Sequence, residues 1–120
     1  MKEAGREVEY KYSVRLQPPK TYGYVRRASA ELSSHARVAD KDFPNLVASA
    51  LRETTSMNFA QITLANYLPA HERILLADAV YALAIPDLEN NPFDRVARSA
   101  LRFSNRLRSN AVYEIHIAHA

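Results

Sequence analysis

Residues 70–84 in the middle of the chain read AHERILLADAVYALA, and apolar side chains occupy almost every side of a helix over this stretch. Pro69 precedes it, and Pro86 follows it. Because proline is tolerated at a helix start but disrupts its interior, we expect a helix over about 70–84 that Pro86 ends. A helix that is apolar all round is buried, so this segment is the predicted core helix.

Helical patterns also precede this segment. Apolar residues recur at helical spacing over 43–51, after Asp40 or Asp42 as the N-cap and with Pro44 near the start. Residues 58–68 fit a helix or a strand, and we favour a short helix with Ser56 as its N-cap. Residues 33–39 have no clear period and are expected to form a loop.

One more helix is expected after the core helix. Asn91 is its predicted N-cap, Pro92 its first residue, and Asp94 lies in its first turn. It is expected to run to about Arg108 and to stop near Asn110.

Strand patterns mark both ends of the chain. Residues 8–16 alternate apolar and polar side chains, and residues 21–27 give a second strand after a four-residue link that contains two prolines. Residues 112–118 alternate in the same way and give a closing strand. The sequence therefore predicts an α+β fold: an N-terminal β-hairpin plus a C-terminal strand forming a small antiparallel sheet, with three to four helices packed on one face.

Length and composition limit what the protein can be. A chain of 120 residues is expected to form a single domain over 1–120. The absence of cysteine excludes disulfide scaffolds and thiolate chemistry, and two glycines leave no glycine-rich phosphate loop. We predict no cofactor and no metal, since His116 and His119 point to opposite sides of a strand. Without a long apolar run or a signal-like start, a cytoplasmic protein with no membrane span is expected.

Charge is distributed unevenly. Residues 1–40 carry eight basic and five acidic groups, residues 41–90 three and six, and residues 91–120 five and two. The ends are thus basic and the middle is acidic. This pattern indicates an anionic partner for the ends or pairing between the ends and the middle.

Arginines form a row on the last predicted helix. At about 100° per residue, four of them share an arc of roughly 80°: Arg95, Arg98, Arg102 and Arg106. Like charges at this spacing slightly destabilise a helix, so we expect another interaction to compensate the repulsion between the arginines. Phosphate groups would supply it, and so would acidic side chains of residues 72–89. Asp78, on the core helix, is expected to pair with an arginine of the last helix.

A second candidate surface depends on the register of the predicted hairpin. If Leu16 pairs with Thr21, the outer face of the sheet carries tyrosines among basic groups, an arrangement that stacks unpaired bases. A slip of one residue would bury the tyrosines instead. The candidate residues on this face are Lys11, Arg15, Tyr22, Tyr24 and Arg26.

These features predict a small non-catalytic protein that engages nucleic acid or a nucleoprotein complex. The alternative is a protein–protein interaction module, such as an inhibitor or adaptor of a nucleic-acid-handling enzyme or a homodimer, whose arginines meet an acidic protein surface. An enzyme would need the arginines to converge with an acid such as Asp78 in a pocket, and no catalytic constellation stands out. We therefore predict that the protein is not an enzyme.

Overall fold

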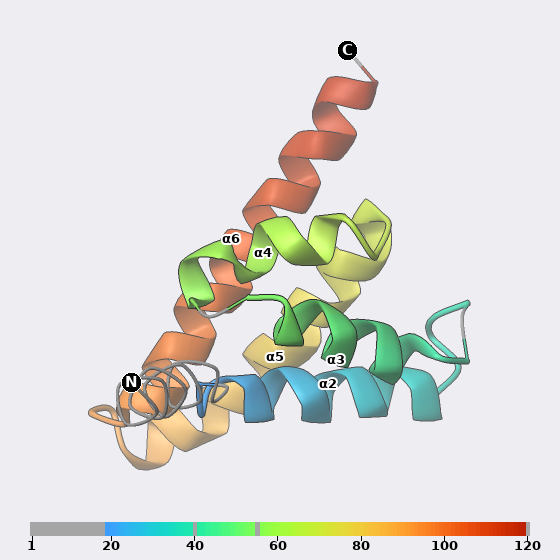
Figure 1. Cartoon of the computed structure of the whole chain (residues 1–120). Coiled ribbons are helices and arrows are strands. Elements are labelled where there is room, and N and C mark those ends of the chain that lie inside the picture. Colours follow the sequence, from blue (N-terminus) through green and yellow to red (C-terminus); the bar gives the residue numbers. More distant parts are fainter. Residues whose placement is uncertain (1–18, 40, 55, 120) are drawn as a thin grey trace, which may run out of the picture.

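The computed structural model describes residues 19–39, 41–54 and 56–119, and these residues form helices and connecting turns without a strand (Figure 1). The predicted α+β fold is therefore wrong for this part of the chain. The helices are α2 (Tyr22–Ser34), α3 (Phe43–Arg52), α4 (Met57–Ala65), α5 (Ala70–Asn90) and α6 (Arg95–Ala118).

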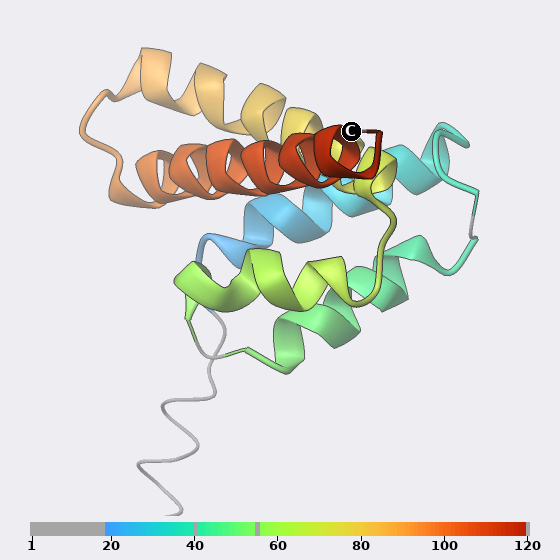
Figure 2. The ribbon, with the colours of Figure 1, turned by 90° about the horizontal axis from the view of Figure 1, so that it is seen from above.

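The two longest helices, α5 and α6, form an antiparallel hairpin (Figures 1 and 2). The hydroxyl of Ser104 on α6 donates a hydrogen bond to the carbonyl of Ala77 on α5, 2.6 Å away, between two buried residues. The predicted helix over 70–84 is confirmed as part of α5, but it is not buried all round, since Asp78, Tyr81 and Ala82 are exposed. Leu76 and Val80 are fully buried there, as is Leu107 on α6.

The remaining helices close a ring around the core. Helix α2 packs on α5, α3 on α2, α4 on α3, and α4 returns to α6. Phe43 and Val47 of α3, Leu64 of α4 and Val25 of α2 are fully buried inside this ring. The ring brings α4 beside α6, although the two helices lie far apart in the sequence.

Residues 21–27, predicted as the second hairpin strand, lie almost entirely in α2. The buried residues Tyr22, Val25, Ser29 and Leu32 follow one another three or four positions apart, which is helical periodicity. The seven residues read as a strand were too few to reveal this periodicity, and burial overrides the strand propensity of tyrosine and valine. The first predicted strand, residues 8–16, lies outside the described residues.

The predicted closing strand, residues 112–118, is also helical and forms the last turns of α6. Asn110 does not stop this helix. Phe103, Leu107 and Ala111 are buried at intervals of four, and half-buried Ile115 continues the series. The packed stripe thus runs past Asn110. Three apolar or aromatic residues of the predicted strand are exposed instead: Val112, Tyr113 and Ile117.

Two further helix boundaries differ from the prediction. Pro86 lies inside α5, which continues to Asn90. Proline leaves only the carbonyl of Ala82 without its helical N–H, and Ala82 is exposed, so water can satisfy that carbonyl. Helix α6 starts at Arg95 with Asp94 as N-cap rather than Asn91, because the Asp94 carboxylate accepts from two backbone N–H groups of the first turn.

Helices α3 and α4 agree with the sequence prediction. Asp42 is the N-cap of α3, with Pro44 in its first turn. The ambiguous segment after Ser56 is a helix, and the Ser56 hydroxyl caps it by accepting from the backbone N–H of Asn58 at 3.2 Å. This cap fixes the start of α4 beside α6.

Candidate anion-binding site

The arginine row predicted from the sequence lies on a solvent-facing side of α6. All four side chains are exposed: Arg95, Arg98, Arg102 and Arg106. We call this set the arginine face. At about 1.5 Å per residue it extends over roughly 16 Å of helix. Residues such as Ala100, Phe103 and Leu107 occupy the buried side of the same helix.

No carboxylate of the described residues forms an ion pair with the arginine face. The nearby acids have other partners. Glu114 pairs with Arg73, and Asp78 pairs with Arg108 at 3.1 Å. Asp87 accepts from the hydroxyl of Tyr24, and Asp94 caps α6. The expected pairing of Asp78 with an arginine of the last helix is confirmed, but its partner, Arg108, is not part of the arginine face.

The arginine face carries an electrostatic cost for the fold. Arg98, Arg102 and Arg106 repeat at intervals of four, where like charges destabilise a helix by a few tenths of a kcal/mol per pair. Arg95 and Arg98 also lie in the first turn of α6, at the positive end of the helix dipole, where the N-cap carboxylate of Asp94 offsets only part of the charge. A bound anion would relieve both effects.

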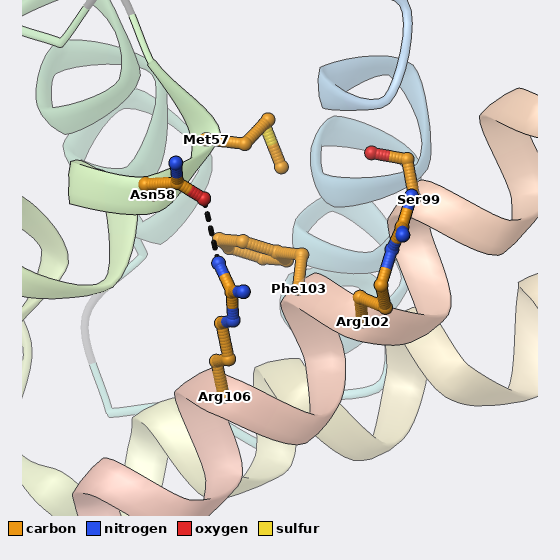
Figure 3. A pocket seen from close by; sticks show the side chains of 6 residues that line it. All are labelled: Met57, Asn58, Ser99, Arg102, Phe103 and Arg106. Carbon is orange, nitrogen blue, oxygen red and sulfur yellow. Dashed lines mark hydrogen bonds between the residues drawn. The ribbon is translucent and has the colours of Figure 1, made fainter.

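Two arginines of this face line a pocket between α4 and α6, which we call the α4–α6 pocket (Figure 3). Its volume is about 260 Å³. The lining residues are Met57 and Asn58 from α4 with Ser99, Arg102, Phe103 and Arg106 from α6. A pocket of this volume, lined by two guanidiniums, has room for a phosphate group.

Asn58 positions one of the guanidiniums. Its side-chain oxygen accepts from Arg106 at 2.6 Å, and Figure 3 shows Arg106 reaching from α6 toward α4. Phe103, which is 3% exposed, anchors this part of α6 in the core. Arg102 has no hydrogen-bond partner among the described residues. The pocket therefore combines one held and one unpaired guanidinium.

The second predicted surface is not formed as expected. Tyr22 is fully buried, and this burial raises the pKa of its hydroxyl above the ordinary value. Tyr24 is half-buried, and burial together with its hydrogen bond to Asp87 raises its pKa to about 12. Arg26 is exposed on α2. Lys11 and Arg15 lie outside the described residues. Because Tyr22 is buried and Tyr24 is half-buried, both on a helix, these two tyrosines do not form the expected exposed face of a sheet.

Sequence reasoning missed the contribution of α4 to the site. Asn58 belongs to a segment without a distinctive motif, and only the ring of helices brings it to Arg106. Ser99 was detectable, because it lies within about 40° of the arginine face on a helical wheel.

The arrangement can bind anions by charge and hydrogen bonding. Among the described residues, no three side chains of histidine or carboxylate type gather as metal ligands. None of the described helices combines the length and apolarity needed to span a membrane.

Comparisons of the chain with protein-family models, with curated proteins and with solved structures gave no match.

Proposed function

We propose that this chain is a small non-catalytic cytoplasmic protein that binds nucleic acid, alone or within a nucleoprotein complex, through the arginine face of α6. The observation that carries this proposal is the lack of an ion pair between these four exposed guanidiniums and any carboxylate of the described residues. Guanidinium groups match phosphate oxygens with two parallel hydrogen bonds.

The composition of the arginine face favours nucleic acid over an acidic protein surface. The arginines recur about once per turn of α6, and exposed Asn105 between them is polar, while Val96, Ser99 and Leu101 are half-buried. Protein interfaces centre on buried aromatic and apolar anchors, with charges at the rim. Between Arg95 and Arg106 no aromatic or apolar side chain is exposed on α6, and such a row of cations suits a ligand whose charge repeats along its length.

The α4–α6 pocket supplies a defined phosphate position within this face. Arg106 is already held by Asn58, and Arg102 lines the same pocket. A phosphate bound there would receive hydrogen bonds from both guanidiniums, while the outer arginines of the face contact neighbouring phosphates. Such binding reads charge and spacing rather than base sequence.

Fluorescence anisotropy with labelled oligonucleotides of about 20 residues, at about 50 mM salt, tests the proposal. The unmodified chain is expected to bind. Arg102→Gln/Arg106→Gln is expected to weaken binding roughly 10- to 100-fold and to lower the slope of log K against log salt by about 1.5, because two phosphate contacts are lost.

Lys41→Gln/Arg52→Gln provides a charge-matched control. Both residues are exposed, Arg52 belongs to α3, and α3 does not contact α6. This control is expected to change affinity by less than about threefold. Equal weakening by the two variants would indicate that net charge alone matters, and an unmodified chain that does not bind at low salt would exclude the proposal. Binding of polyglutamate as tight as that of nucleic acid would favour the acidic protein partner.

A further inference from the structure

An exposed tyrosine continues the arginine face toward the C-terminal end of α6. Tyr113 follows Arg106 by seven residues, about two helical turns, and therefore lies on the same side of the helix. Its side chain is 65% exposed and has no hydrogen-bond partner among the described residues. The last turns of α6 extend beyond the other helices (Figure 1).

Tyr113 differs from the tyrosines that serve the fold. Tyr22 is buried, while Tyr24 and Tyr67 donate hydrogen bonds to Asp87 and Glu53. Tyr113 has neither burial nor a bond of this kind. An exposed aromatic ring beside a row of cations is the combination by which proteins bind single-stranded nucleic acid, since the cations hold the backbone and the ring stacks on a base.

The spacing suits this division of roles. Tyr113 lies roughly 10 Å beyond Arg106 along the helix axis, a span that a few nucleotides of a single strand can cover. Exposed Ile117, one turn further, adds apolar surface beside the ring. A base paired in a duplex is stacked between its neighbours and cannot reach Tyr113, whereas an unpaired base can.

We infer that the ligand of α6 is single-stranded nucleic acid, with phosphates on Arg102 and Arg106 and an unpaired base stacked on Tyr113. This inference rests on the proposed function and adds the strandedness of the ligand. It also gives Tyr113 a role in binding that differs from that of the arginines: the tyrosine discriminates between strand types, while the arginines supply charge.

Anisotropy titrations of Tyr113→Leu and Tyr113→Phe against a single strand and a duplex of equal length test the inference. Tyr113→Leu keeps apolar area but lacks an aromatic face, so it is expected to lose roughly tenfold in affinity for the single strand and little for the duplex. Tyr113→Phe is expected to bind both as the unmodified chain does. Because the side chain is exposed, both variants are expected to fold, which circular dichroism verifies.

The outcomes separate this inference from the proposed function. If Arg102→Gln/Arg106→Gln weakens binding to both ligands but Tyr113→Leu changes neither, the function stands and the inference is wrong. If Tyr113→Leu lost equal affinity for the single strand and for the duplex, this result would also overturn the inference. So would a dimer, measured by sedimentation, that Tyr113→Leu converts to a monomer, because the ring would then be a subunit contact.

Discussion

Among the hollows on the surface of the bundle that arginine lines, two differ in charge pairing, because the described residues provide a carboxylate partner in one of them but not in the other. The first lies where the turn between α4 and α5 meets the end of α6, and it contains Arg73 and Glu114. Arg73 is 3% exposed, pairs with Glu114 and donates from Nε to the carbonyl of Leu68 at 3.1 Å. The second is the α4–α6 pocket, where Arg102 and Arg106 form no ion pair with a described carboxylate.

The difference follows from burial. A guanidinium that leaves water must be paired and hydrogen-bonded, since an uncompensated buried charge costs several kcal/mol. Arg73 meets this condition and joins the start of α5 to the end of α6. The exposed guanidiniums of Arg102 and Arg106 remain hydrated, so they need no partner for folding. The first arginine site therefore stabilises the fold, and the second is available for a ligand.

The largest expected effect on stability comes from removing the partner of the buried arginine. Glu114→Gln leaves Arg73 without a carboxylate and is expected to lower the free energy of unfolding by about 2 kcal/mol in urea denaturation. This is less than the 3–5 kcal/mol for a fully buried pair, because the Glu114 side chain is 56% exposed.

A double-mutant cycle with Arg73→Met sharpens this prediction. If Glu114 stabilises the fold by compensating the charge of Arg73, the two residues are expected to show a coupling energy of about 1 kcal/mol or more. Additive effects of the two substitutions would mean that Arg73 does not depend on Glu114, and the contrast between the two hollows would then lose its basis.

The arginine face is expected to respond in the opposite direction. Arg98→Gln/Arg102→Gln removes like-charge neighbours and one charge from the first turn of α6, so the free energy of unfolding should rise by roughly 0.5 kcal/mol at low salt. About 1 M NaCl should abolish the gain because it screens the repulsion. A loss of stability of about 1 kcal/mol or more would show that these side chains serve the fold, contrary to the comparison.

The features predicted best from the sequence are those in which a helical pattern repeats over many residues. The apolar α5, the Ser56 cap of α4 and the arginine row could all be identified from spacing and capping chemistry. Short alternating segments such as 112–118 fit a strand or a helix, and the choice depends on where the buried stripe ends. That stripe continues through Ala111 to Ile115, which only the packing of α6 on the bundle determines.

The candidate site was predictable to the same extent. Four arginines on one side of a helix follow from their spacing alone, but their lack of carboxylate partners does not. Asp78 could have paired with any arginine of the last helix, and its selection of Arg108 depends on the register of α5 against α6. The side chain of Asn58 reaches Arg106 only because the ring of helices returns α4 to α6.

The smallest expected effect concerns the exposed pair between Asp78 and Arg108. Both side chains are more than half exposed, so Asp78→Asn is expected to lower the free energy of unfolding by about 0.5 kcal/mol or less. The substitution also leaves Arg108 without its carboxylate. The proposed binding of nucleic acid, measured at low salt, should therefore become tighter by up to about threefold, because one more uncompensated charge lies on α6. Weaker binding by Asp78→Asn would contradict the view that arginines paired within the chain are withheld from the ligand.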